Sequence, residues 1–262
     1  MKKLGIIGLG HMGMAIAKGA AASIGAGEIA ACDPSPEKQN EGTSLGFTMT
    51  GSVAELCGIA HMILVAVRPQ DISALLEELA QTKPECLLTI AAGIPMKRFS
   101  DAMAPLPIIR AMPNTPLQLG EGAVALCRNE LCGDADFSFA VDLFRTMGKA
   151  CEITEDHMCD IIAVNGSTPA YFYYLVECLL EDAVRRGIDE ADARELIVQT
   201  MIGSGKMLMA DKNKPISTFV DEVCSKGGTT IEAINVMKAA GFNRIIQDAD
   251  TACIRRAEEL GK

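Results

Sequence analysis

The strongest constraint on the fold lies near the N-terminus, where residues 3–13 read KLGIIGLGHMG. An apolar run typical of a buried strand leads directly into Gly8, Gly10 and Gly13, and the following MAIAKGAAAS is typical of a helix. In this strand–turn–helix context a GxGxxG pattern indicates a dinucleotide-binding turn. Gly8 permits the tight turn, Gly10 lets the backbone approach a pyrophosphate, and Gly13 lets helix and strand pack closely. The pyrophosphate is expected at the helix N-terminus, where unpaired N–H groups favour negative charge. A glycine-rich turn without a ligand is the alternative.

An acidic residue ends the second apolar run, where a ribose contact is expected. Asp33 stands 20 residues after Gly13, and a carboxylate there accepts hydrogen bonds from the ribose hydroxyls and repels the 2′-phosphate of NADP. Asp33 therefore favours NAD, although Ser35 and Lys38 in DPSPEK could turn toward a phosphate instead. The alternative for Asp33 is an aspartate that starts a turn before Pro34.

The pattern of apolar segments divides the chain into two parts. In the first part, short runs rich in Ile, Val and Leu alternate with helix-length stretches, which predicts βαβ units and a mostly parallel sheet covered on both faces. The predicted strands read LGIIGL, EIAACD, HMILVAV, ECLLTIAAG and PIIRAM, and the predicted helices span 12–24, 36–45, 70–80 and 134–147. Beyond about residue 155 only helical periodicity remains, over 168–187, 190–210, 215–224, 230–240 and 243–260. The sequence therefore predicts an α/β, Rossmann-like domain over 1–154 and an all-helical domain over 155–262.

Composition narrows the range of partners. The net charge of −10 argues against nucleic acid, because neutralising phosphates requires clustered Lys and Arg. The ten cysteines show no CxxC spacing, so we expect buried free thiols at Cys57, Cys86, Cys127, Cys178 and Cys253, and no metal site. Free thiols suit a reducing cytosol, and no segment has the 18 or so continuous apolar residues of a membrane span. A cytoplasmic protein is expected.

A second glycine-rich stretch, CSKGGTTIE at residues 224–232, stands near the C-terminus. Thr229 followed three residues later by Glu232 is a capping box, which predicts a helix start. Gly227 and Gly228 allow backbone N–H groups to converge on an anion at that start. An ordinary capped helix is the alternative that these residues alone favour.

Further motifs share an order and spacing with one known family. They read AVRP at 66–69, AAG at 91–93, MPNTP at 112–116, NGSTPAY at 165–171 and GGTTIEA at 227–233. Together with the first glycine motif they resemble the pyrroline-5-carboxylate reductase family, over nearly the whole chain. The resemblance implies a Rossmann domain, a helical dimerisation domain, and reduction of 1-pyrroline-5-carboxylate to L-proline by hydride transfer from NADPH or NADH. A homodimer or higher homo-oligomer through the C-terminal helices is implied as well.

The resemblance also implies which residues form the site. Thr230 is implied as the catalytic hydrogen-bond donor to the ring nitrogen. The implied substrate contacts are Ser167, Gly228, Thr229 and Thr230. The implied cofactor contacts are Ile7, Gly8, Leu9, Gly10, His11, Met12, Gly13, Asp33, Ala66, Val67, Arg68, Pro69, Ala92, Gly93 and Asn114. For Arg68 a solvated surface cation, and for the prolines of MPNTP a rigid loop, are the alternatives.

The chain departs from the family pattern at His11, Asn165, Thr168 and Lys226, where the family usually has Asn, Ser, a small residue and Pro. The last three leave open a paralogue that reduces another cyclic imino acid. A catalytically idle, nucleotide-binding regulator is a further alternative. A β-hydroxyacid dehydrogenase is disfavoured, because that family carries a lysine in its interdomain helix and NGSTPAYFYYLVE has none.

Overall fold

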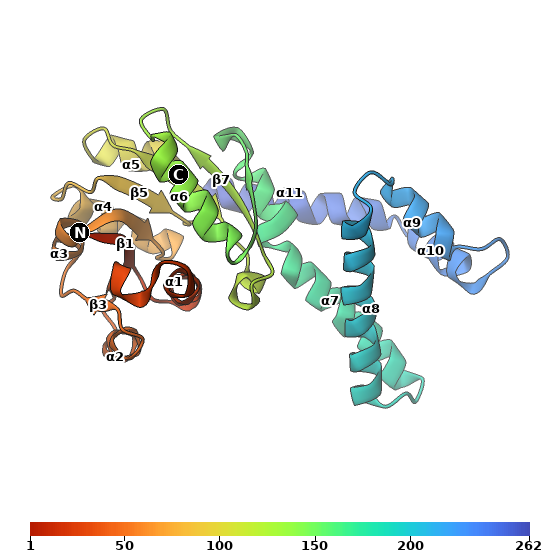
Figure 1. Ribbon diagram of the computed structural model, residues 1–262. Helices are drawn as coiled ribbons and strands as arrows, with labels where there is room; N and C mark the ends of the chain where they lie inside the picture. Colours follow the sequence, from red (N-terminus) through yellow and green to blue (C-terminus); the bar gives the residue numbers. More distant parts are fainter. The chain divides into compact units, whose positions relative to one another are not determined.

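The computed structural model describes residues 1–262 and divides into two compact units (Figure 1). One unit comprises Met1–Pro169 together with Ala252–Lys262, and the other comprises Ala170–Thr251. Residues 155–169 and the last 11 residues therefore pack with the sheet. The predicted division between the functional domains, at 154/155, stays a prediction. The first compact unit of the structure extends further along the chain, to Pro169.

An eight-stranded sheet forms the centre of the first unit, in the order β3-β2-β1-β4-β5-β6-β7-β8. Its strands are β1 (Lys2–Ile7), β2 (Ile29–Cys32), β3 (Thr48–Met49), β4 (Ala60–Val65), β5 (Cys86–Thr89), β6 (Ile108–Met112), β7 (Gly122–Arg128) and β8 (Gly148–Glu152). All neighbours are parallel except β6 and β7. The nine residues between those two strands are too few for a crossover, so β7 returns antiparallel.

Helices cover both faces of this sheet. They are α1 (His11–Ile24), α2 (Pro36–Ser44), α3 (Val53–Ile59), α4 (Ile72–Leu79), α5 (Met96–Ala102) and α6 (Asp134–Arg145), with short helical turns η1 (Ala26–Glu28), η2 (Pro69–Asp71), η3 (Thr115–Leu119), η4 (Glu155–His157) and the π-helical η5 (Ile162–Gly166). Successive side chains of β4 point to opposite faces: Met62 and Leu64 pack with α1 and α6, whereas Ile63 and Val65 pack with α3, α4 and α5. Each fully buried Leu or Ile stabilises the fold by about 1.5–3 kcal/mol.

The second unit is helical throughout. It contains most of α7 (Thr168–Arg185), all of α8 (Glu190–Ala210), α9 (Ile216–Val223) and α10 (Thr229–Ala239), and the first part of α11 (Phe242–Leu260). Asp189 caps α8 by accepting hydrogen bonds from the backbone N–H groups of Ala191 and Asp192. None of the helices combines the length and apolar character that crossing a membrane requires.

The predicted fold class is confirmed. All five predicted strands and all nine predicted helices are present, and the helix ends agree to within two residues. Three strands and two short helices were missed, namely β3, β7, β8, α3 and α5. Cys57, Cys86 and Cys127 are buried free thiols as expected, but Cys178 is exposed in this chain. Burial raises the pKa of the Cys127 thiol to about 12, so this thiol is unreactive at neutral pH.

Candidate functional site

The carboxyl ends of the parallel strands lie level with one another, and the predicted cofactor residues follow these ends. Ile7 is in register with Cys32 on one side and Val65 on the other, and Val65 is in register with Thr89. The chain winds outward from β1 to β3 in one direction and from β4 to β6 in the other. The switch point between β1 and β4 is where open α/β sheets bind ligands. The loops that follow β1, β2, β4, β5 and β6 are separated in sequence but meet at this edge of the sheet.

The first of these loops has the geometry expected of its glycines. Gly8 has φ of +92°, and its N–H donates to the Cys32 carbonyl oxygen at 2.9 Å. A Cβ on Gly13 would lie 2.0 Å from the Gly8 carbonyl oxygen, so only glycine allows α1 to approach the loop this closely. Gly10 is the N-cap of α1, makes no side-chain cap, and has open space where a Cβ would stand. The uncapped N–H groups and this space fit a pyrophosphate.

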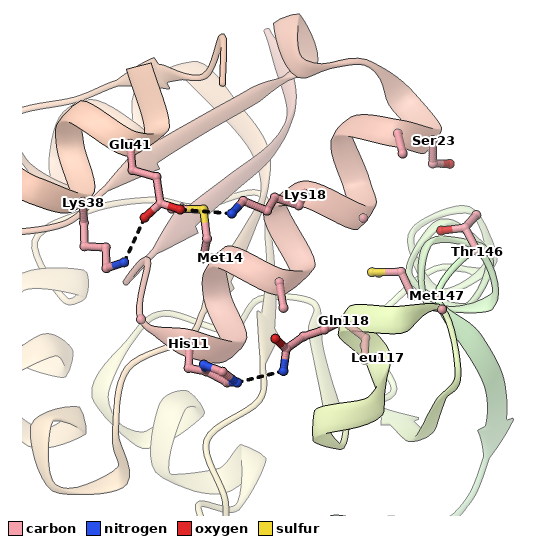
Figure 2. A pocket seen from close by; sticks show the side chains of 15 residues that line it. His11, Met14, Lys18, Ser23, Lys38, Glu41, Leu117, Gln118, Thr146 and Met147 are labelled. Carbon is pink, nitrogen blue, oxygen red and sulfur yellow. Dashed lines mark hydrogen bonds and ion pairs between the residues drawn. The ribbon is translucent and has the colours of Figure 1, made fainter. Parts of the chain in front are cut away.

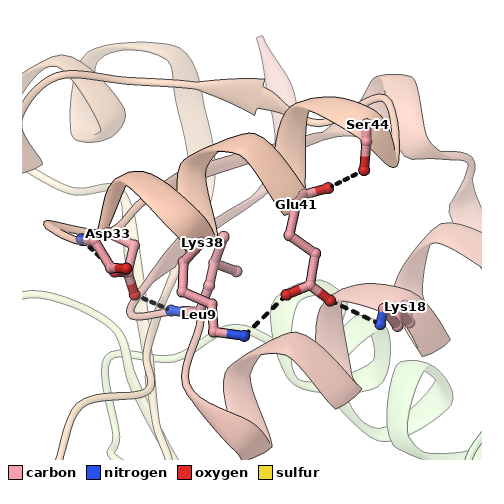
Figure 3. Close-up of polar contacts among 7 residues, drawn as sticks. Leu9, Lys18, Asp33, Lys38, Glu41 and Ser44 are labelled. Atoms are coloured by element: carbon pink, nitrogen blue, oxygen red, sulfur yellow. Dashed lines mark hydrogen bonds and ion pairs between the residues drawn. The ribbon is translucent and has the colours of Figure 1, made fainter.

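Asp33 holds the same loop from the end of β2 (Figure 3). One carboxylate oxygen, Oδ2, accepts from the Leu9 N–H at 2.6 Å, and the other, Oδ1, accepts from the Ser35 N–H at 2.9 Å. The residue is 9% exposed. The hydrogen bond from the Ser35 N–H shows that Asp33 starts a turn, as the alternative to ribose binding predicted. Each carboxylate oxygen nevertheless keeps a second lone pair for a ribose hydroxyl. Leu9 itself is buried, so only its backbone faces the loop.

A cavity of about 730 Å³ runs beside α1, from Gly10 and His11 past Lys18 toward the end of α6 (Figure 2). His11 meets Gln118 of η3 across it, with 2.8 Å between His11 Nε2 and Gln118 Nε2. The departure from the family pattern at residue 11 therefore links the glycine loop to the loop between β6 and β7. Met12, the next residue, is partly buried against the core.

The loop after β4 contacts the glycine loop directly. The Ala66 N–H donates to the Ile7 carbonyl oxygen at 2.9 Å, and a Cβ on Gly8 would lie 2.9 Å from the Ala66 carbonyl oxygen. Val67 packs against the core, and Pro69 begins η2. Arg68 is exposed and paired with Asp71 at 2.9 Å, as the alternative of a solvated cation expected.

The AAG motif after β5 has a packing role that the sequence did not reveal. Gly93 has φ of +80°, and a Cβ there would lie 2.2 Å from the Ala257 carbonyl oxygen of α11. Ala92 is partly buried against the same core cluster that contains Ala257. Gly93 is therefore required for the final helix to pack on the sheet.

Two asparagines tie the MPNTP loop to the π-helical turn η5. Asn114 accepts from the Ala123 N–H at 2.9 Å and donates from Nδ2 to the Asn165 carbonyl oxygen at 3.2 Å. Asn165 Nδ2 donates to the carbonyl oxygens of Met112 and Ala123, at 2.9 and 2.8 Å. Asn165 Oδ1 is buried without a partner. Asn165, recognised in the sequence only as a departure, thus fastens η5 to the ends of β6 and β7.

Ser167 and Thr168 follow η5 in the same unit. The Ser167 hydroxyl lies 3.2 Å from Cys253 Sγ of α11. Thr168 Oγ1 donates to the Ala163 and Val164 carbonyl oxygens of the preceding turn, at 2.7 and 2.6 Å. The hydroxyl at position 168 thus has a structural role, and the substrate contact of Ser167 stays a prediction.

One buried charge was also missed by the sequence interpretation. Arg110 lies in β6 at 2% exposure. Its Nη1 is 3.5 Å from Glu155 Oε1, its Nη2 is 4.0 Å from Cys159 Sγ, and its Nε has no partner. The signal was available, because an arginine inside the apolar run PIIRAM must be buried with a partner if that run is a central strand.

The GGTT residues lie in the second unit, at the N-terminus of α10. The expected capping box is wrong: Gly228, with φ of −81° and ψ of 171°, is the N-cap, and Thr229 is the first helical residue. Gly227 has φ of +74°, and the Gly228 N–H donates to the Ser225 carbonyl oxygen at 2.9 Å. A Cβ on Gly228 would lie 2.4 Å from Ser225 Oγ, so a side chain there would require the serine hydroxyl to move. Thr229 and Thr230 therefore stand in the first turn of an uncapped helix, and their role toward the crevice stays a prediction.

Comparison with known proteins gives matches over the whole chain. A family model described as pyrroline-5-carboxylate reductase dimerisation matches residues 155–260, and one described as NADP oxidoreductase coenzyme F420-dependent matches residues 3–93. The pyrroline-5-carboxylate reductase of Escherichia coli (strain K12) is 35% identical over 267 residues, covering 100% of this chain and 99% of the relative. That of Haemophilus influenzae is 33% identical over 264 residues, covering 99% and 97%.

Solved structures of pyrroline-5-carboxylate reductases are also similar to this chain over almost its whole length. The pyrroline carboxylate reductase of Plasmodium falciparum with NADP bound matches with a TM-score of 0.89 and 28% identity, covering 100% of this chain and 98% of the other. The 1-pyrroline-5-carboxylate reductase of Streptococcus pyogenes matches with a TM-score of 0.90 and 29% identity, covering 98% of both.

Proposed function

Because this chain belongs to the pyrroline-5-carboxylate reductase family, as the motifs indicated, we propose that it reduces 1-pyrroline-5-carboxylate to L-proline with NADPH or NADH. The chain is an NAD(P)H-dependent oxidoreductase, and the bond reduced is the C=N of the cyclic imine. The observation that carries this function is the similarity to the Escherichia coli enzyme over 100% of the chain. The meeting of five loops at the carboxyl edge of the sheet supports it.

The N-terminal unit provides the residues that bind the dinucleotide. The backbone from Ile7 to Gly13 receives the pyrophosphate at the uncapped start of α1, and Asp33 accepts the ribose hydroxyls. Ala66–Pro69 flank the ribose, and Ala92, Gly93 and Asn114 approach the nicotinamide end. When bound, the reduced nicotinamide supplies a hydride to the ring carbon of the C=N bond. The protonated imine is already electrophilic, so the chain needs to supply position and field rather than a strong acid.

The start of α10 provides the substrate contacts. The backbone N–H groups of Thr229 and Thr230 and the Thr229 hydroxyl hold the substrate carboxylate at a helix N-terminus, where negative charge is stabilised. Thr230 is proposed to hydrogen-bond the ring nitrogen and thereby to orient the C=N bond. Ser167 is proposed as a further substrate contact. The left-handed turn at Gly227 and the first turn of α10, which has no side-chain cap, support this assignment.

The test is a spectrophotometric assay of NADH and NADPH oxidation with 1-pyrroline-5-carboxylate and with its six-membered homologue. The wild type is expected to turn over the five-membered imine. Replacing Thr230 by Ala should lower kcat/KM roughly 10- to 100-fold, because one hydrogen bond to a charged group contributes about 1.5–3 kcal/mol. The same change should leave the nucleotide Kd unaltered, and an equal loss of both would contradict the role of Thr230.

Two outcomes separate the alternatives. Preference for the six-membered imine would support a paralogue, which the Asn165, Thr168 and Lys226 departures leave open. No turnover of either imine by folded protein that binds nucleotide would support an idle regulator and exclude the proposed enzyme.

We propose a homodimer or higher homo-oligomer that forms through the C-terminal helices. The matched dimerisation family over residues 155–260 supports it. Between α7 and α8 lies an apolar groove of about 570 Å³, and Phe172, Leu179, Leu196 and Leu208 line it. Tyr173 and Tyr174 beside it are 63% and 67% exposed in the single chain, an apolar surface typical of an interface. Light scattering should give at least twice the 27.8 kDa of one chain, and a monomer at micromolar concentration would contradict the proposal.

We further propose that the enzyme acts in the cytoplasm on a small imino acid, without nucleic acid or membrane partners. All ten cysteines are free, which suits a reducing compartment. The net charge of −10 disfavours nucleic acid. Fractionation of cells that express the protein tests the compartment, and recovery with membranes would contradict it.

A further inference from the structure

Two lysines line the cavity that begins at Gly10 beside α1. Lys18 comes from the middle of α1, and Lys38 comes from the first turn of α2, five residues after Asp33 (Figure 3). Lysine binds phosphate as a point charge. This pair would therefore be expected to attract the 2′-phosphate that distinguishes NADPH from NADH.

Glu41 of α2 forms ion pairs with both lysines. Its Oε1 lies 3.0 Å from Lys18 Nζ and its Oε2 lies 2.9 Å from Lys38 Nζ. The hydrogen bond from Lys38 and, to a smaller extent, the one from Lys18 lower the pKa of Glu41. The Glu41 carboxylate therefore stays charged at neutral pH. Figure 2 shows the three side chains on one wall of the cavity beside α1.

The Asp33 carboxylate adds a second negative charge that cannot turn away. Its two oxygens are fixed by the N–H groups of Leu9 and Ser35, and the residue is almost buried. Asp33 acts electrostatically on Lys38, and Glu41 pairs with both lysines, so two negative charges oppose the two positive ones. Together they have no net positive charge to offer a phosphate, whereas a ribose hydroxyl can still donate to Asp33.

We infer that Glu41 is a specificity-determining residue, which makes this enzyme select NADH over NADPH by neutralising Lys18 and Lys38 next to Asp33. This inference rests on the proposed cofactor site. Glu41 acts through the lysines rather than by touching the dinucleotide. The selectivity for NADH thus arises from charges that disfavour the 2′-phosphate of the competing ligand, NADPH.

The test is calorimetric binding of NADH and NADPH to the full chain, which does not depend on turnover. The wild type is expected to bind NADH at least about 10-fold more tightly. Glu41→Gln keeps the shape of the side chain but removes the charge that neutralises both lysines, and should tighten NADPH roughly 10-fold while NADH changes by less than about twofold. Combining it with Asp33→Ser should reverse the preference, by roughly 100-fold or more in the ratio.

Glu37→Gln is the matched control. Glu37 lies on the same helix, is exposed, and forms no ion pair with either lysine. Its charge acts on Lys38 only through space, so Glu37→Gln should change the ratio of affinities much less than Glu41→Gln does. A wild type that prefers NADPH, or a Glu41→Gln ratio equal to that of Glu37→Gln, would overturn the inference. If the folded wild type binds neither nucleotide, the proposed cofactor site is itself wrong. Circular dichroism melts confirm that each variant is folded.

Discussion

Replacing Gly13 by Ala is expected to abolish most nucleotide binding and to destabilise the N-terminal unit. The added Cβ would lie 2.0 Å from the Gly8 carbonyl oxygen, which is backbone and cannot rotate aside. Either α1 or the glycine loop must shift, and overpacking of this kind costs roughly 1–3 kcal/mol. The shift also moves the N–H groups that face the pyrophosphate, so nucleotide affinity should fall roughly 10- to 100-fold. Urea unfolding and calorimetric titration with NADH and NADPH measure the two effects.

Gly10→Ala separates the two effects, because a Cβ at Gly10 meets nothing within 4 Å and the backbone φ of −62° suits alanine. The free energy of unfolding should change by less than about 1 kcal/mol, while the new methyl group occupies the space proposed for the pyrophosphate. Affinity should therefore fall in both variants and stability only in Gly13→Ala. Unchanged nucleotide affinity in Gly10→Ala would show that the dinucleotide does not lie at the start of α1.

The elements that the sequence predicted are those whose signal is local. Buried parallel strands read as apolar runs, and the longer helices show periodicity with Gly or Pro at their ends, so these were found, whereas the seven-residue helices α3 and α5 were missed. Of the missed strands, only β7, which reads GAVALCR, is an apolar run, and the other two lack such a signal. β3 has two residues, and β8 is an edge strand with exposed, polar positions. β7 owes its antiparallel pairing to the short connection after β6, which a search for βαβ units does not consider.

The site shows the same division between local and tertiary signals. Spacing alone identified Gly8, Gly10, Gly13 and Asp33 as candidates, because all four lie within one βαβ unit. The bond from the Leu9 N–H to Asp33 spans 24 residues of sequence, and the Asn114–Asn165 link spans 51. Such contacts require the folded chain. The capping box at Thr229 failed for a local reason, since the Gly227 turn shifts the N-cap to Gly228.

Replacing Glu155 by Ala is expected to give the largest loss of stability among the polar substitutions considered. Glu155 Oε1 accepts from the Met96 N–H at 2.6 Å and lies 3.5 Å from Nη1 of the buried Arg110. Without it the guanidinium keeps only the distant Cys159 thiol, and an uncompensated buried charge costs about 3–5 kcal/mol. The midpoint of urea unfolding, compared with the wild type at equal slope, measures the loss.

Removing the charge as well as its partner should rescue the fold, which distinguishes an unpaired charge from a simple cavity. Arg110→Met removes the guanidinium, including the unpartnered Nε, and replacement of a buried ion pair by an apolar residue is often neutral. The Glu155→Ala, Arg110→Met double variant should therefore be more stable than Glu155→Ala alone. Glu152→Ala removes an exposed carboxylate of β8 and should change the free energy of unfolding by less than about 0.5 kcal/mol. If the double variant instead loses the sum of the two single losses, the cost at Glu155 does not come from leaving Arg110 unpaired, and the ion pair between the partly exposed Glu155 and the buried Arg110 does not stabilise this end of the sheet.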